Sequence, residues 1–205
     1  MARWEPNARE RLAKAALELY QERGFDETAV ADIAARADLT ERTFFRYFAD
    51  KREVLFGGSS ELQDLLTSSI AAAPDSSVPI DIVAAALQAS AALFEERRAF
   101  AKVRQAVISG HPALRERELI KLASLAEAMA EALYRRGVTE PSAALAAEAG
   151  MAVFKLAFAR WLADGKKRDL AHHLREALDQ LKAVTSAPND APGGRTTPAS
   201  RRRAR

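Results

Sequence analysis

The sequence predicts an all-α protein in which three small helices precede about six larger ones. Apolar residues recur at spacings of three and four through most of the chain, and strand-like alternation of apolar and polar residues is absent from the sequence. Residues that start or end helices, such as Thr, Asp, Pro and Gly, divide these segments into helix-sized pieces. With 205 residues, 48% of them hydrophobic, the chain is long enough for one sizeable core or two small ones.

The first three helices are short and have clear boundaries. A helix is expected over residues 9–24. A second helix of about eight residues is expected to start at a cap formed by Thr28. Asp38 can occupy the left-handed turn position that follows at small cost. Thr40 is then expected to cap a third helix.

The third helix separates two kinds of side chain. Phe44 and Phe48 are four residues apart, so they lie on one face and are expected to pack against the preceding helices. The other side carries Arg42, Thr43, Phe45 and Arg46. Arginine and hydroxyl groups bind phosphates, whereas arginine forks and apolar side chains read base edges and thymine methyl groups. The pattern is typical of a helix-turn-helix and indicates sequence-specific binding to double-stranded DNA.

A plain surface helix, in which every phenylalanine belongs to the core, is the simpler alternative. It explains Phe44 and Phe48 well. It does not explain Phe45, which lies about 100° further round the helix from Phe44 and stands among basic residues.

Residues 8–56 resemble the DNA-binding domain of the TetR family of transcriptional regulators. The resemblance rests on the caps, the apolar spacing, the segment Thr43-Phe-Phe-Arg-Tyr-Phe48, and Lys51. It implies that Thr28, Thr43, Tyr47 and Lys51 contact phosphates and that Arg42, Phe45 and Arg46 face the major groove. The predicted DNA-binding residues are Thr28, Thr40, Arg42, Thr43, Phe45, Arg46, Tyr47 and Lys51.

Two residues depart from the family pattern. Asp38 stands where the family usually has Gly, and the left-handed turn tolerates this change. Phe45 stands where the family most often has Tyr, so one hydroxyl donor to phosphate is missing. Phe45 is therefore expected to touch a base methyl group or a sugar.

The rest of the chain also divides into helices and domains. Helices are expected over residues 53–73, 80–97, 98–108, 112–136 and 141–163, and from a cap at Asp169 to residue 184. The predicted domains are a helix-turn-helix DNA-binding domain (1–52), a helical effector-binding and dimerisation domain (53–185) and a basic tail (186–205). The Pro, Gly, Ser, Thr and Arg composition of the tail predicts disorder.

The family resemblance also implies a homodimer, because in the TetR family the last two helices pack against their copies in a second subunit. The dimer contacts expected here are Ala149, Ala152, Val153, Leu170, Leu174, Leu178 and Leu181. Packing within one chain explains these side chains equally well. Independently, two recognition helices held about 34–36 Å apart by a two-fold axis can read a palindrome, whereas one helix reads only a half-site.

A regulator of this kind also implies a pocket for a small-molecule effector. The candidate residues are Phe94, Phe100, Val103, Arg104, Val107, Leu125, Met129, Phe154 and Phe158. Simple core packing explains each of them without a ligand. An inward Arg104 would favour an anionic effector such as a carboxylate or phosphate. The C-terminal half, which ends with Arg160-Trp-Leu-Ala-Asp-Gly165, also resembles the regulators of mycofactocin gene clusters, which implies a long-chain acyl-CoA.

The overall charge is a poor guide to DNA binding. The sequence pI is about 9.3, but the residues from Ser186 onward hold five arginines and one aspartate. The charge of these residues exceeds the net charge of +3 of the whole chain. The rest of the chain is therefore nearly neutral. DNA binding must therefore depend on the basic cluster between Arg42 and Arg52.

The sequence gives no sign of catalysis, a cofactor or a metal site. It has no cysteine, which suits a cytoplasmic protein, and it lacks the Gly-x-Ser-x-Gly, phosphate-loop and His-Glu-x-x-His motifs. Neither a signal peptide nor a membrane segment is expected. Two alternatives stay open: a DNA-binding dimer without an effector, and an all-helical enzyme whose site assembles from scattered Asp, Glu and Arg residues.

Overall fold

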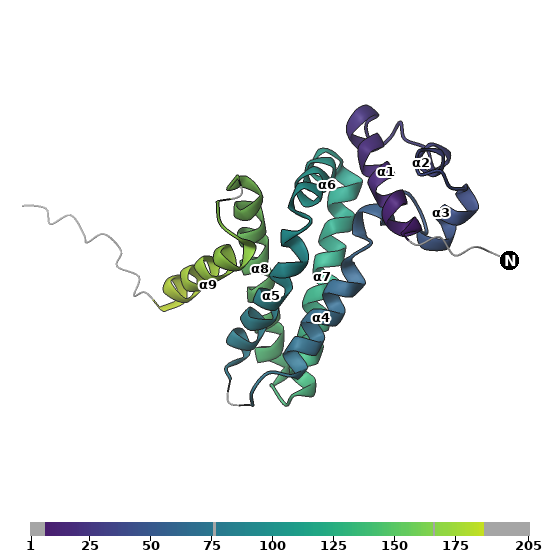
Figure 1. Cartoon of the computed structure of the whole chain (residues 1–205). Helices are drawn as coiled ribbons and strands as arrows, with labels where there is room; N and C mark the ends of the chain where they lie inside the picture. The colour runs from purple at the N-terminus through teal and green to yellow at the C-terminus, as the bar shows by residue number, and fades with distance from the viewer. Residues whose placement is uncertain (1–6, 76, 166, 187–205) are drawn as a thin grey trace, which may run out of the picture.

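The computed structural model describes residues 7–75, 77–165 and 167–186 and confirms the all-α class. Within these ranges the chain forms nine α-helices and one 3₁₀ turn, without strands. Figure 1 shows the first three helices as a small unit at one end of a larger bundle. The predicted basic tail, apart from Ser186, lies outside the described residues.

The small unit consists of α1 (Ala8–Arg23), α2 (Val30–Arg36) and α3 (Glu41–Tyr47), followed by the 3₁₀ turn η1 (Glu53–Phe56). Gly24 ends α1 with φ of 88°, and Asp38 adopts the expected left-handed conformation with φ of 53°. Thr40 caps α3, because its hydroxyl oxygen accepts the backbone N–H of Thr43 at 3.1 Å.

The predicted cap at Thr28 is wrong by one residue. Ala29 is the N-cap of α2, and the carboxylate of Asp32 accepts the Ala29 backbone N–H at 3.2 Å. The Thr28 hydroxyl instead donates to the carbonyl oxygen of Gly24 at 2.7 Å. A serine or threonine hydroxyl can bond to a nearby backbone carbonyl as well as to a helix end, so the residue type alone did not distinguish the two roles.

The larger unit contains six helices, most of which run alongside one another in Figure 1. They are α4 (Ser59–Ala71), α5 (Pro79–Glu95), α6 (Arg98–Gly110), α7 (Pro112–Arg135), α8 (Glu140–Ala163) and α9 (Leu170–Ser186). The predicted helix over residues 53–73 is interrupted, because the Gly57–Gly58 pair separates η1 from α4. The predicted cap at Asp169 is confirmed, since its carboxylate accepts the His172 backbone N–H at 2.7 Å.

Helices α5, α7, α8 and α9 enclose the main apolar core, which includes Leu87, Met129, Phe154, Trp161 and Leu174. Helices α5 and α8 approach closely at Gly150. A Cβ atom there would lie 2.2 Å from Cγ1 of Val83, so no larger residue fits without a shift of the helices.

Helix α8 is long and apolar enough to meet the criterion for a membrane-spanning helix. Core helices of soluble proteins meet the same criterion, and α8 contributes Gly150, Phe154, Ala157 and Trp161 to the buried interior. Its apolar character is therefore weak evidence for a membrane segment.

Candidate DNA-binding site

Helix α3 presents one buried and one exposed face. Phe44 is fully buried and Phe48 is 4% exposed, which confirms the predicted packing face. Phe45, by contrast, has an exposed fraction of 55%. Its ring stands edge-on to Phe44, with 5.4 Å between centroids and 84° between ring planes, so the buried ring supports the exposed one.

Two arginines flank the exposed phenylalanine. Arg42 and Arg46 are both exposed on α3. The Arg46 guanidinium lies 4.9 Å from the ring centroid of Tyr47 and donates to its hydroxyl at 3.2 Å. Tyr47 therefore restrains the direction of Arg46. With other described residues the Arg42 side chain forms neither an ion pair nor a hydrogen bond, so its charge is available to a partner.

Thr40 and Thr43 lie at the start of the same helix. Thr40 is exposed, Thr43 is half-buried, and their hydroxyl oxygens are 3.0 Å apart. Two hydroxyls at a helix N-terminus suit phosphate binding, because the helix dipole favours negative charge there. The structure thus brings together Thr40, Arg42, Thr43, Phe45, Arg46 and Tyr47 on one helix.

Thr28 and Lys51 are placed differently from the prediction that they contact phosphates. Thr28 is fully buried. The Lys51 ammonium donates to the carbonyl oxygens of Phe25, Asp26 and Thr28 at 2.9, 3.1 and 3.0 Å. It also lies 4.5 Å from the ring centroid of Phe25. All three ammonium hydrogens are thus used to hold the loop between α1 and α2.

This placement changes the expected effect of Lys51→Met. Removing the ammonium leaves three carbonyls without their donor, so we expect the free energy of unfolding to fall by about 1–3 kcal/mol. Urea denaturation monitored by circular dichroism measures it. The salt dependence of DNA binding by the folded variant should be unchanged. If the salt slope instead falls by about one ion at unchanged stability, Lys51 binds a phosphate.

The small unit is connected to the bundle through α6 and α7. Arg104 of α6 donates to the carbonyl oxygen of Leu55 at 2.5 Å and to the Glu118 carboxylate at 3.1 Å. Burial lowers the pKa of the Arg104 guanidinium, and the charge of Glu118 opposes this shift. Glu53 of η1 pairs with Arg117 and, at 3.3 Å, with Lys121, both on α7.

The same corner contributes apolar side chains to the core of the small unit. Ile108 and Leu114, which flank the turn between α6 and α7, are fully buried in the cluster that contains Leu12, Phe44 and Phe56. At the turn itself, His111 lies 3.0 Å from the Asp26 carboxylate. Residues of α6 and α7 therefore complete a core that the predicted boundary at residue 52 divides between two domains.

Comparison with known proteins identifies this architecture. Residues 12–56 match the family described as bacterial regulatory proteins, tetR family, and residues 77–186 match the MftR C-terminal domain. MftR of Mycobacterium tuberculosis, provisionally named a mycofactocin biosynthesis transcriptional regulator, is 30% identical over 187 residues. This alignment covers 87% of this chain and 89% of MftR.

The chain belongs to the TetR family of transcriptional regulators.

Two further transcriptional regulators are similar to it. HTH-type transcriptional regulator TcmR of Streptomyces glaucescens is 32% identical over 81 residues, which cover 40% of this chain and only 36% of TcmR. The structure of the TetR-family repressor FadR of Thermus thermophilus, solved in complex with lauroyl-CoA, aligns with a TM-score of 0.51 at 26% identity. That alignment covers 91% of this chain and all of the FadR chain.

Eight of the nine predicted pocket residues lie in or against one of the two cores, and Arg104 lies in neither. Phe94, Leu125, Met129, Phe154 and Phe158 lie in or against the main core. Phe100, Val103 and Val107 pack against the core of the DNA-binding unit, so their place in an effector pocket stays a prediction. The Arg104 guanidinium binds Leu55 and Glu118 between the two units. The helical spacing of these residues indicates that their side chains point inward. It does not indicate which of the two cores they enter.

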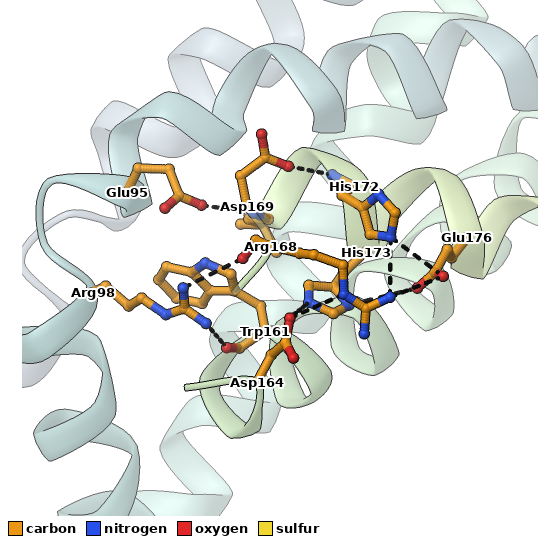
Figure 2. A network of polar contacts seen from close by, with 10 residues as sticks. Glu95, Arg98, Trp161, Asp164, Arg168, Asp169, His172, His173 and Glu176 are labelled. Carbon is orange, nitrogen blue, oxygen red and sulfur yellow. Dashed lines mark hydrogen bonds and ion pairs between the residues drawn. The ribbon is translucent and has the colours of Figure 1, made fainter. Parts of the chain in front are cut away.

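Two open hollows lined by charged side chains lie near the loop between α8 and α9. One, of about 430 Å³, is lined by Arg160, Ala163, Asp164, Arg168, His173 and Glu176. The other, of about 370 Å³, includes Glu95, Glu96, Arg98, Lys167, Arg168 and Asp169. Figure 2 shows the polar network that joins them. A hydrogen bond from Arg168 lowers the pKa of Asp164, which also accepts from His173.

The predicted dimer residues are divided between the core of the chain and its surface. Val153, Leu170, Leu174 and Leu178 are buried in the core of a single chain, as the alternative explanation had it. Leu181 is half-buried and packs at the edge of the same core. Ala149 and Ala152 are at least partly exposed on α8.

Among the described residues, no group of three or more His, Asp or Glu side chains could hold a metal ion.

Proposed function

We propose that this TetR-family regulator is a cytoplasmic repressor that binds a palindromic operator as a homodimer and leaves it when a small-molecule effector binds. The observation that carries the proposal is the exposed face of α3. Arg42, Phe45 and Arg46 project from a helix whose opposite face is anchored by buried Phe44 and Phe48. Residues 53–185 would sense the effector and hold the dimer together.

An apolar stripe along α8 supports the homodimer. Leu145, Ala149, Ala152, Leu156 and Ala159 follow one another at spacings of four and three, so they lie on one face of the helix. All five are at least partly exposed, and Leu145 has an exposed fraction of 72%. Small and branched residues at this spacing permit close helix packing. Packing against a second copy of α8 would remove this apolar stripe from water.

The effector is proposed to be an acyl-CoA. One observation supports this choice: the chain shares 26% identity with a FadR solved with lauroyl-CoA. An acyl chain also needs apolar surroundings, which the cluster of Phe94, Phe154 and Phe158 in the main core offers.

The contacts between the two units suggest how the signal would reach DNA. Helices α6 and α7 hold η1 through Arg104 and through the Glu53 ion pairs. A shift of these helices on effector binding would therefore move the DNA-binding unit and change the separation of the two α3 helices. An effector must prefer the non-DNA conformation by about 10⁴-fold for near-complete switching.

A fluorescence-anisotropy titration tests the proposal. The purified protein is titrated against its own upstream DNA and against scrambled DNA at about 150 mM salt, and lauroyl-CoA is then added to the complex. Specific binding that lauroyl-CoA reverses is the expected result. Specific binding that no acyl-CoA reverses would favour a constitutive DNA-binding dimer. Without a preference for the upstream DNA, a genome-wide selection of binding sites decides whether any operator exists.

The substitution Arg46→Ala tests the recognition helix directly. If the restrained Arg46 reads a base, the free energy of specific binding should weaken by about 1–3 kcal/mol, whereas binding to scrambled DNA should change much less. Arg175→Ala is the matched control, since it removes the same charge from an exposed position on α9. If Arg46→Ala weakens binding to the upstream DNA and to scrambled DNA equally, Arg46 contacts a phosphate and does not read a base.

A further inference from the structure

Four aromatic rings meet at the C-terminal end of α8. The Phe158 ring lies 5.6 Å from Phe154 and 5.4 Å from Trp161, measured between centroids. Phe94 of α5 lies 5.8, 5.5 and 6.5 Å from Phe154, Phe158 and Trp161. Phe94 and Phe158 are only half-buried, so the cluster can be reached from the surface.

One polar atom in this cluster lacks a partner. Trp161 is fully buried, and its indole Nε1 makes no hydrogen bond. The indole N–H can only donate, and a buried donor without an acceptor is unfavourable. Most buried polar groups in proteins are paired, so an unpaired donor inside an aromatic cluster points to an acceptor that arrives with a ligand.

Arg98 lies at the boundary between this cluster and a charged hollow. Its guanidinium is 4.9 Å from the Trp161 ring centroid, and it also lines the hollow of about 370 Å³. Figure 2 shows its hydrogen bonds to the carbonyl oxygens of Trp161 and Arg168. Arg98 thus lies between the Trp161 indole and the charged hollow, and it covers one side of the aromatic cluster.

The arrangement favours a neutral acceptor over a charged one. A carboxylate beside Trp161 would pair with the Arg98 guanidinium and draw it away from the two backbone carbonyls that it now binds. A neutral carbonyl needs only the indole N–H. The surrounding rings accept an apolar chain on either side of such a group.

We infer that the Trp161 indole N–H is the hydrogen-bond donor of the effector site and binds the neutral carbonyl of an ester or thioester whose apolar chain lies among Phe94, Phe154 and Phe158. This inference rests on the proposed effector function and specifies its chemistry. It excludes free fatty acids as the preferred ligands, and it adds Trp161 and Arg98 to a site from which the sequence pattern had omitted both.

The test uses three probes: lauroyl-CoA, the thioether S-dodecyl-CoA, which lacks the carbonyl, and dodecanoate. Trp161 becomes the sole tryptophan in a Trp4→Phe protein, because the chain has two tryptophans. In that protein lauroyl-CoA should move the ¹⁵N-indole proton resonance downfield, as a new hydrogen bond does. It should bind about tenfold more tightly than the thioether or the free acid.

The variant Trp161→Phe keeps the aromatic ring and removes only the donor. Its affinity for lauroyl-CoA should fall about tenfold, to that of the thioether, whose own affinity should be unchanged. Equal binding of thioester and thioether to the parent, or a resonance that stays in place, would overturn the inference. That result is independent of the variant's stability.

Operator release separates this inference from the function on which it rests. If lauroyl-CoA releases the parent and Trp161→Phe equally well, the sensing repressor stands and the role of Trp161 is refuted. If no probe binds the parent, the acyl effector and the inference both fail, while specific operator binding would still support a DNA-binding regulator.

Discussion

The substitution Phe44→Ala should destabilise the DNA-binding unit more than any other single change in α3. Phe44 is fully buried and contacts the rings of Phe45 and Phe48, so truncation leaves a cavity and removes the support of the exposed face. We expect the free energy of unfolding to fall by about 3–5 kcal/mol. Urea denaturation monitored by circular dichroism measures it, and operator binding should be lost together with the fold.

Its neighbour provides the matched control. Phe45→Ala removes the same side chain from an exposed position, so the free energy of unfolding should change by less than about 1 kcal/mol. Specific DNA affinity should nevertheless fall, because the ring is lost from the face that α3 presents to DNA. If Phe44→Ala unfolds like the parent, or Phe45→Ala proves the more destabilised of the two, the assignment of the two faces is reversed.

The substitution Leu156→Glu should convert the proposed dimer into monomers. Leu156 lies within the apolar stripe of α8 with an exposed fraction of 42%, and a two-fold interface would bury two added carboxylates near each other. Analytical ultracentrifugation should detect the monomer. Loss of the second half-site should weaken operator binding by about 10²–10⁴-fold, since the two α3 helices no longer act together.

A second exposed leucine distinguishes this effect from a general effect of added charge. Leu119 on α7 has an exposed fraction of 63% and lies outside the α8 stripe, so Leu119→Glu should leave both the dimer and operator binding intact. A Leu156→Glu protein that still sediments as a dimer would require another interface. If the parent protein is already a monomer, the proposal that a dimer binds a palindromic operator fails.

The helix boundaries were largely predictable, because they are encoded locally. Gly24, Thr40, Pro112 and Asp169 mark helix ends through backbone freedom, a missing N–H or a side-chain acceptor, and each acts where the sequence placed it. The helix expected at residues 53–73 is interrupted for a local reason too, since two consecutive glycines disfavour a continuous helix.

The destinations of side chains were much less predictable. A leucine on the apolar face of α9 has the same pattern whether it meets its own core or a second subunit, and Leu170, Leu174 and Leu178 meet their own core. Lys51 likewise could serve a phosphate or backbone carbonyls, and the structure gives it the carbonyls. Such choices depend on contacts between residues far apart in sequence, which periodicity does not record.

The shared core at the corner of α6 and α7 limits how such regulators can be recombined. A hybrid sensor made by joining residues 1–52 of this chain to the effector domain of another protein would separate Phe44 from Ile108 and Leu114. The transferred DNA-binding unit would then expose apolar surface and fold poorly. A workable graft should also transfer the α6–α7 corner, including Arg104, so the practical unit of exchange is discontinuous in the sequence.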